Sequence, residues 1–273
     1  MQILDEKYSK IILEEKLLLQ ALLAEIKELS DKELEGRLRS VEERLDNLFS
    51  LVFIGEFSTG KSSIINALLG QEILPKGITP TTDEITVIKY GDRREESVEN
   101  GCRVITVPQD RLKGLFIVDT PGTNVTIAQH ERLTEEYIPK ADIVFFTIGA
   151  ERAVTGSETK LIRFIKESWL KNIVFLLNKI DIAADGEELD TLIRHARGEL
   201  ERSFGIKPHL LPVSARLARE GASSSDKELY NRSGFQELER YIFDTLSEEE
   251  RVKMKIAATS EFAVSLCSET ERA

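Results

Sequence analysis

The sequence predicts an α/β fold with a doubly wound, mainly parallel sheet, and a small helical bundle formed by the two ends of the chain. Short runs rich in Val, Ile and Phe alternate with helical stretches in the centre, which is typical of parallel strands covered on both faces. Both ends carry apolar residues at helical spacing. We therefore expect N-terminal helices at 1–48, an α/β domain at 49–245 and a C-terminal helix at 246–273.

The two ends of the chain predict amphipathic helices. Apolar residues on one stripe of a helix over residues 8–29 are Ile11, Ile12, Leu18, Leu19, Leu22, Ile26 and Leu29. Ser30 and Asp31 can end this helix and cap the next, whose apolar positions are Leu34, Leu38, Val41, Leu45 and Leu48. The stretch SEEERVKMKIAATSEFAVSLC predicts a further helix. We expect these helices to pack together; the alternative is that they are ordinary surface helices of the central domain.

Apolar runs predict the strands of the sheet. They are LVFIG at 51, ITVIKY at 85, LFIVDT at 115, DIVFFTIGA at 142, NIVFLLNK at 172 and HLLPVSA at 209. In open α/β sheets, ligands bind beyond the carboxyl ends of the strands. Every candidate site described below lies at the carboxyl end of one of these runs, so we expect the candidate residues to meet at the carboxyl ends of the strands.

Composition limits the classes of function. The formal net charge of -11 argues against sequence-independent binding of nucleic acid, which requires clustered Lys and Arg. Cys102 and Cys267 lie far apart without a CxxC pair, so neither a disulfide framework nor a metal knuckle is indicated. No run approaches about 18 consecutive apolar residues, and the first residues include acids that signal peptides avoid. We expect a soluble chain without a nucleic-acid partner.

The stretch GEFSTGKS fits the phosphate-binding pattern GxxxxGK[ST], placed between a strand and a helix as that pattern requires. Gly55 and Gly60 let backbone N–H groups face the phosphates, Lys61 reaches the β- and γ-phosphates, and Ser62 offers its hydroxyl to Mg²⁺. The predicted nucleotide contacts are Gly55, Glu56, Phe57, Ser58, Thr59, Gly60, Lys61, Ser62 and Ser63. The alternative is a glycine-rich turn that binds no phosphate.

A second group of candidates follows the run LFIVDT. Asp119 ends this strand, and its carboxylate can hold Mg²⁺ through water, while the backbone N–H of Gly122 can bond the γ-phosphate. The polar segment LPKGITPTTDEITVI supplies Thr82 as the residue expected to close on Mg²⁺ and the γ-phosphate. Other hydroxyls in that segment remain alternatives, namely Thr79, Thr81 and Thr86. Thr123 stands where Ras-like switches carry a glutamine, so the group that orients water must come from elsewhere.

The run LLNKID predicts recognition of guanine through Asn178, Lys179 and Asp181. Asp181 can accept hydrogen bonds from the ring N–H and the exocyclic amine of guanine, and adenine has no matching pair of donors. The alternative is a solvated loop acid. After the next strand, the tripeptide Ser214, Ala215 and Arg216 is predicted to touch the base.

The stretches GEFSTGKSSIINALLG, LPKGITPTTDEIT, DTPGTN, RLTEEYIPKADIVFF and LLNKIDI resemble the GTPase domain of the dynamin superfamily. The likeness is to the mitofusin-like and bacterial dynamin-like branch, in particular the chloroplast fuzzy-onions-like (FZL) proteins, and covers roughly residues 50–215. It implies a P-loop GTPase domain with neck helices, which hydrolyses GTP with Mg²⁺ to drive membrane remodelling or fusion. It also implies homodimers paired across their nucleotide faces, and membrane contacts through regions absent from this chain. The implied location is the thylakoid or inner envelope of chloroplasts, or the bacterial inner membrane.

The resemblance assigns further roles. Counting from Leu74, the family's catalytic threonine falls on Thr82, and Ser58 matches a serine that helps to hold a monovalent cation, K⁺ or Na⁺. Phe57 stands where dynamins carry a glutamine, and Thr79 where they carry a glycine of the cation-binding loop, so this chain departs from the pattern for that cation. The implied catalytic residues are Ser58, Lys61, Thr82 and Gly122, and the implied metal ligands are Ser62, Thr82 and Asp119.

Two other functions remain open at this point. One is a ribosome- or RNA-associated regulatory GTPase, because such enzymes also carry the P-loop, DTPG and NKxD patterns. The acidic composition argues against it. The other is a GTP-dependent scaffold with negligible hydrolysis, in which the nucleotide controls only assembly.

Overall fold

The computed structural model of the chain forms two compact units, Met1–Phe49 with Thr245–Ala273, and Ser50–Asp244. The structure describes residues 6–29, 32, 34–36, 38–39, 48–75, 85–99, 101–121, 141–151, 172–205 and 207–270.

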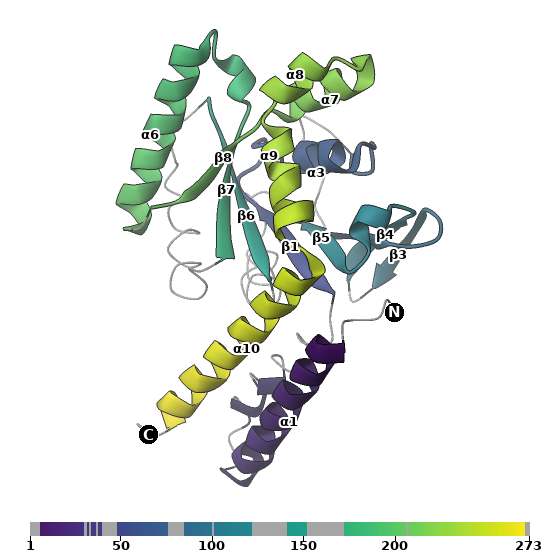
Figure 1. The fold of residues 1–273 in the computed structure, drawn as a ribbon, viewed down its shortest axis with the longest axis vertical. Helices are drawn as coiled ribbons and strands as arrows, with labels where there is room; N and C mark the ends of the chain where they lie inside the picture. The colour runs from purple at the N-terminus through teal and green to yellow at the C-terminus, as the bar shows by residue number, and fades with distance from the viewer. Residues whose placement is uncertain are drawn as a thin grey trace. The chain divides into compact units, whose positions relative to one another are not determined.

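The larger unit is built on a sheet whose eight described strands follow the order β3-β4-β2-β5-β1-β6-β7-β8 (Figure 1). The strands are β1 (Phe49–Ile54), β2 (Thr86–Tyr90), β3 (Glu95–Glu99), β4 (Cys102–Val107), β5 (Leu115–Asp119), β6 (Ile143–Gly149), β7 (Ile173–Asn178) and β8 (His209–Pro212). Strand β1 pairs in parallel with β6, β6 with β7, β7 with β8, and β2 with β4. Strand β2 is antiparallel to β5, and β3 to β4. The predicted mainly parallel sheet is confirmed.

The described helices of the larger unit lie between these strands or after the last of them. They are α3 (Lys61–Leu69), η1 (Asp110–Leu112), η4 (Ile180–Ile182), α6 (Gly186–Phe204), α7 (Ala215–Ser224), α8 (Lys227–Arg232) and α9 (Phe235–Glu239). A π-helix, η5 (Arg240–Thr245), continues the chain toward the smaller unit. Helix α6 starts at an Asp185 cap whose carboxylate accepts from the Glu188 backbone N–H, and ends at Gly205 in the left-handed conformation.

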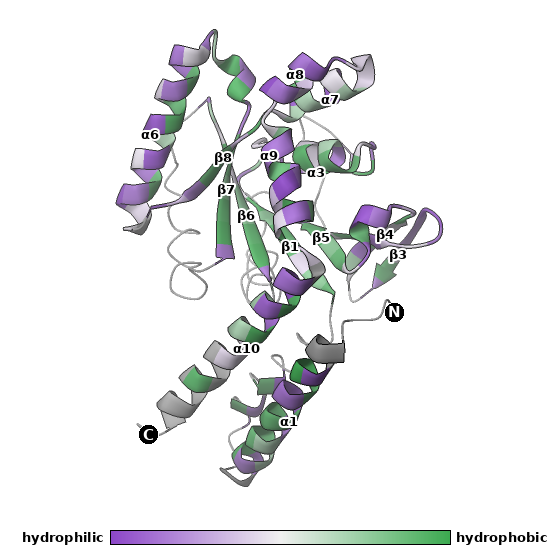
Figure 2. Ribbon diagram, viewed as in Figure 1, coloured by the Kyte–Doolittle hydropathy of each residue, from purple (hydrophilic) through white to green (hydrophobic). Residues whose placement is uncertain are grey.

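Strand β6 shows why both faces of the sheet are covered. Phe145 and Phe146 are neighbours in a strand and therefore point to opposite faces. Phe146 packs against Phe175 on the face that also carries α6. Phe145 stacks on Phe53 with ring centroids 4.8 Å apart and meets the edge of Tyr241 in η5. Figure 2 accordingly shows β1, β6 and β7 as apolar along most of their length.

Strands β3 and β4 are absent from the predicted strand list. All five residues of β3 are exposed and three are glutamates, so β3 has neither the apolar run nor the alternation by which a strand is predicted. It pairs with β4 and forms the outer edge of the sheet. Charged side chains on an edge strand oppose pairing with other chains, and this is a common reason for their presence there.

The smaller unit contains α1 (Glu6–Leu29) and α10 (Glu248–Thr270). Its apolar cluster joins α1 to the following segment and consists of Leu19, Leu23, Ile26, Leu34 and Leu38. The Ser260 hydroxyl donates to Glu15 at 2.7 Å, so the helices from the two ends pack together as predicted. The expectation that Leu18 lies on the buried stripe is wrong, because its side chain is 67% exposed and the buried stripe runs through its neighbour Leu19. Val41 and Leu45 lie outside the described residues.

None of the described helices is both long and apolar enough to cross a membrane.

A buried polar contact fixes the amino ends of β1 and β6. The Ser50 backbone N–H and hydroxyl both donate to Oδ2 of Asp142, at 2.8 and 2.9 Å, and the Ser50 hydroxyl accepts from the Asp142 backbone N–H at 2.9 Å. Both residues are buried. This contact ties the start of β1 to the start of β6 and helps to set the register in which the two strands pair.

Asp142→Ala should lower the free energy of unfolding by about 2 kcal/mol, because it removes a charged acceptor from two buried donors of Ser50. Ser50→Ala, which removes the hydroxyl alone, should cost about 1 kcal/mol. Urea denaturation measures both, with Asp190→Ala on the exposed surface of α6 as the control. An Asp142→Ala variant as stable as that control would contradict this role.

Candidate functional site

The loop between β1 and α3 packs closely against residues of β6 and β7. Gly55 and Gly60 have φ values of 147° and 93°, and Ser58 is also in the left-handed region at 63°. A Cβ at Gly55 would collide with the Thr147 carbonyl of β6, and one at Gly60 would collide with the Asn178 amide. Both glycines are therefore required by close packing as well as by backbone conformation.

Lys61, the first residue of α3, is buried beneath this loop. Its ammonium donates to the carbonyls of Gly55 at 2.9 Å and Glu56 at 3.0 Å. The Thr59 hydroxyl also donates to the Glu56 carbonyl, at 2.9 Å. A positive charge is thus held inside the curve of the loop, at the amino end of a helix, where an anion is favoured.

The carboxyl end of β5 brings a carboxylate to the same place. The Ser62 hydroxyl donates to Oδ2 of Asp119 at 2.6 Å. Burial raises the pKa of Asp119 to about 6, against the opposing effects of the Lys61 charge and the Ser62 hydrogen bond. Among the described residues, the other oxygen, Oδ1, has no hydrogen-bond partner although it is buried. Hydroxyl and carboxylate oxygens with a spare buried lone pair suit Mg²⁺, which takes oxygen ligands and keeps several waters.

Asn178, at the carboxyl end of β7, connects three segments. Its Nδ2 donates to the Thr59 carbonyl of the phosphate loop at 2.8 Å, and its Oδ1 accepts from the Ala215 backbone N–H at 3.2 Å. The side chain is buried. The sequence predicts Asn178 as part of the base site, and here it joins the phosphate loop to the loop that follows β8.

Lys179 and Glu151 form an ion pair at the same edge of the sheet, with Nζ and Oε1 2.5 Å apart. Lys179 has a φ of 67°, which turns the chain after β7. The pair forms because Gly149 and Asn178 are register partners in β6 and β7, so the residues after both strands meet. Glu151 is absent from the predicted site. An acidic residue two positions after a strand does not by itself predict a site. The contact of Glu151 with Lys179 becomes evident only from the pairing of β6 with β7.

Asp181 accepts two hydrogen bonds, from the Ser214 hydroxyl at 2.5 Å and from Arg216 Nε at 2.8 Å. Burial opposes the charged form, but the hydrogen bonds from Ser214 and Arg216 and the charge of Arg216 outweigh it, so the pKa of Asp181 lies below its usual range. The Ser214 hydroxyl also caps α7 by accepting from the Leu217 backbone N–H. The Asp181 carboxylate is therefore ionised and is held in position by its hydrogen bonds with Ser214 and Arg216.

The remaining predicted residues divide between described and undescribed segments. Glu56 is buried, Phe57 and Ser63 are half-buried, and Ser58 is exposed. Thr82 and Gly122 lie outside the described residues, as do Thr79, Thr81 and Thr123. Thr86 is described: it is buried in β2 as the register partner of Asp119, and thus belongs to the sheet.

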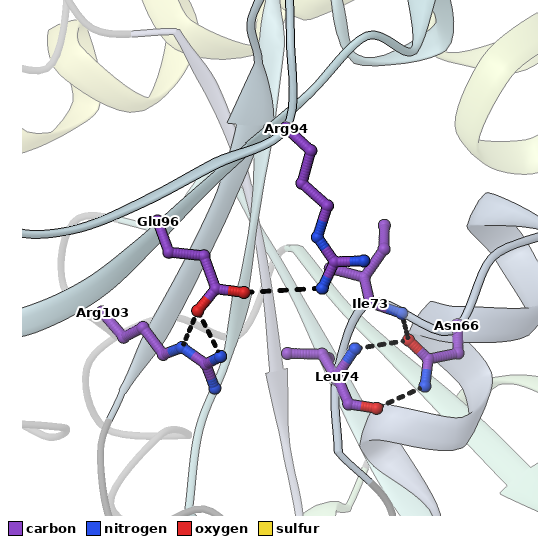
Figure 3. Close-up of polar contacts among 6 residues, drawn as sticks. All are labelled: Asn66, Ile73, Leu74, Arg94, Glu96 and Arg103. Atoms are coloured by element: carbon purple, nitrogen blue, oxygen red, sulfur yellow. Dashed lines mark hydrogen bonds and ion pairs between the residues drawn. The ribbon is translucent and has the colours of Figure 1, made fainter.

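Asn66 of α3 is a second residue that the sequence analysis missed. Its Oδ1 accepts from the backbone N–H groups of Ile73 and Leu74 at 2.9 Å, and its Nδ2 donates to the Leu74 carbonyl at 2.8 Å (Figure 3). The helix that carries Lys61 therefore also fixes the residues just before Pro75. An asparagine inside the otherwise apolar run IINALL was the available signal.

Figure 3 also draws a surface network, in which Glu96 accepts from Arg103 and pairs with Arg94. The Arg103 hydrogen bond is the main reason that the pKa of Glu96 lies below its usual range. These side chains belong to the exposed edge of the sheet, and such pairs contribute little to stability.

Comparison with known proteins gives the family. The model of the dynamin family matches residues 51–103 and 92–180. The Arabidopsis thaliana protein "Probable transmembrane GTPase FZO-like, chloroplastic" is 36% identical over 253 residues, or 84% of this chain and 28% of that protein. Dynamin-like protein 1 of Campylobacter jejuni is 24% identical over 86% of this chain and 42% of that protein.

A solved structure of an oligomerised bacterial dynamin pair has the same fold. It matches with a TM-score of 0.68 and 22% identity, over 97% of this chain and 48% of that one. This chain spans 28% to 48% of the length of these three relatives. From the family match, the relatives and the shared fold, we conclude that the chain belongs to the dynamin family.

Proposed function

We propose that residues 50–244 bind GTP and hydrolyse it to GDP and phosphate. The observation that carries this proposal is the position of Asn178, which joins the phosphate loop to the loop carrying Ser214, Ala215 and Arg216. One side chain thereby brings the groups suited to phosphates next to the groups suited to a base. Membership of a GTPase family supports the same conclusion.

At the phosphate end of this site, positively charged groups and N–H donors are placed to contact the phosphates. Lys61 and the backbone N–H groups at the start of α3 offset the negative charge of the β- and γ-phosphates. Ser62 and Asp119 would hold Mg²⁺, which supplies further charge neutralisation when bound. In hydrolysis the oxygen of water bonds to the γ-phosphorus and the bond from that phosphorus to the bridging oxygen breaks, so that GDP leaves, inorganic phosphate forms and a proton of the water is released.

The base end reads guanine through Asp181. Its ionised carboxylate is 13% exposed and is oriented by Ser214. Guanine presents two N–H donors to such an acceptor, whereas adenine would leave it without matching donors. Lys179, held by Glu151, and Ala215 complete this end of the site.

Turnover requires groups beyond those described. We assign the closing role to Thr82 and the γ-phosphate contact to Gly122, by resemblance to the dynamin superfamily. Ser58 would help a K⁺ or Na⁺ ion to offset charge, although Phe57 departs from the family pattern there. Since Thr123 cannot orient water as glutamine does, we propose that a second copy of the chain supports catalysis by pairing across the nucleotide face.

The wider role is the use of GTP at membranes. It is supported by a relative named as a transmembrane chloroplastic GTPase, and by a bacterial dynamin pair described as sensing and tethering membranes. We propose that the larger unit is the GTPase domain and that α1 and α10 belong to a neck. We propose that this use of GTP takes place at a chloroplast membrane or at a bacterial inner membrane.

Lys61→Ala should abolish tight GTP binding, because it removes the cation at the centre of the phosphate loop. Calorimetric titration with GTP and Mg²⁺ measures the loss, and Lys207→Ala, an exposed lysine before β8, is the matched control. Near-normal GTP affinity in Lys61→Ala, with the fold intact by circular dichroism, would contradict the phosphate site.

Asp181→Asn should weaken GTP binding by about 1–3 kcal/mol, since a charged acceptor facing two donors is replaced by a neutral amide. Asp190→Asn on the surface of α6 controls for the change of net charge. Competition between ATP and GTP on the unmodified chain accompanies this measurement. Equal affinity for the two nucleotides would show that Asp181 does not read guanine.

The chain should be monomeric with GDP and dimeric with GDP plus aluminium fluoride. A ligand that prefers the ordered state must favour the dimer if the dimer orders the site, because linkage makes the two effects reciprocal. Light scattering with GDP, a GTP analogue and the fluoride complex reports the mass. A monomer in all three conditions would rule out pairing as the source of catalytic order.

A further inference from the structure

Thr120 lies directly after Asp119, just beyond the end of β5, and is buried. Its hydroxyl donates to the carbonyl of Phe53 in β1 at 2.8 Å. Strands β5 and β1 are neighbours in the sheet, and Phe53 lies two residues before Gly55 of the phosphate loop. The hydroxyl therefore joins the chain to β1 at a point where β5 itself has ended.

This contact helps to fix the backbone from which the Asp119 side chain extends. On one side, Asp119 is the register partner of Thr86 in β2. On the other side, Thr120 holds the next residue to β1. Thr120 also precedes Pro121, which restricts its backbone to extended conformations, and its branched Cβ restricts the side-chain rotamer. Asp119 is thereby held between β2 and β1.

The two strands joined by this contact also carry groups that meet in the site. Strand β1 leads to Gly55, whose carbonyl accepts from Lys61 at 2.9 Å. Strand β5 places Oδ2 of Asp119 where the Ser62 hydroxyl donates to it at 2.6 Å. Oδ1 of Asp119 is buried and has no hydrogen-bond partner among the residues that the structure describes. A shift of β5 relative to β1 would therefore move this carboxylate relative to the phosphate loop.

We propose that Thr120 is a positioning residue for the Mg²⁺ site, whose bond to Phe53 keeps the Asp119 carboxylate in place beside the phosphate loop. Mg²⁺ demands near-octahedral geometry at short ligand distances, so a small displacement of a group that holds it weakens its binding. Thr120 acts through the backbone and does not bond to the carboxylate. Loss of its hydroxyl should therefore weaken metal binding by about three- to tenfold, less than the roughly 10- to 100-fold typical of a residue bonded directly to a ligand.

This inference rests on the proposed function, and Mn²⁺ is the probe of the metal site. Electron paramagnetic resonance measures the affinity of Mn²⁺ for the complex with GDP, and calorimetry measures GDP affinity in EDTA. The variants are Thr120→Val, Thr120→Ala and Thr120→Ser. Alanine removes the hydroxyl without placing a methyl group against the Phe53 carbonyl, and serine keeps the hydroxyl. Thermal unfolding sets a temperature at which every variant is folded.

Thr259→Val in α10 is the matched control. Thr259 is also buried, and its hydroxyl donates to a backbone carbonyl, that of Lys255, at the same distance of 2.8 Å. It belongs to the smaller unit. The control thus removes the same kind of bond away from the site and reports the effect of lost stability alone.

Thr120→Val and Thr120→Ala should bind Mn²⁺ about three- to tenfold more weakly, with GDP affinity in EDTA unchanged, while Thr120→Ser and Thr259→Val keep the unmodified Mn²⁺ affinity. Unchanged Mn²⁺ affinity in the two variants without the hydroxyl overturns the proposal. An equal loss in Thr120→Ser or in Thr259→Val also overturns it, because the first keeps the bond and the second leaves the site intact. Failure of the unmodified chain to bind GDP would instead remove the proposed function itself.

Discussion

The site depends on one buried amide, the side chain of Asn178. It donates to the phosphate loop at Thr59 and accepts from the loop after β8 at Ala215, so two segments far apart in the sequence are held by one residue. The contact requires Gly60, since any Cβ there would collide with the amide. Asn178 is the last residue of β7. Because β6, β7 and β8 pair in parallel, their carboxyl ends lie on the same side of the sheet, and the loops that follow them can meet there.

Around this amide, the larger unit keeps opposite charges close together in an apolar setting. Lys61 and Asp119 are both buried, and the charge of Lys61 opposes the effect of burial on the pKa of Asp119. Buried charges are costly unless they are paired or hydrogen-bonded. A triphosphate and Mg²⁺ would supply the complementary charges. The apolar packing on the two faces of the sheet, Phe53 with Phe145 and Phe146 with Phe175, fixes the strands from which the site residues extend.

The sequence predicted the residues whose chemistry depends on local pattern. Lys61, Asp119 and Asp181 each lie at or shortly after the end of a recognisable strand, and hydrogen bonds join their segments in the structure. Glu151 and Asn66 could not be found in this way, because their roles come from the register of β6 with β7 and from the return of the chain after α3. Strand β3 was missed because its polar residues have no periodicity. The part of Thr82 in catalysis stays a prediction, since no described contact involves it.

The most direct test of the account is the rate of GTP hydrolysis per molecule, measured over a wide range of protein concentration with Mg²⁺ present. We propose that the site binds and orients GTP, and no group among the described residues is assigned to order water, so the account predicts slow turnover when dilute and a rise per molecule as copies pair. RNA should have no effect on this rate. Turnover per molecule that stays constant at every concentration, or no hydrolysis at any concentration, would contradict it.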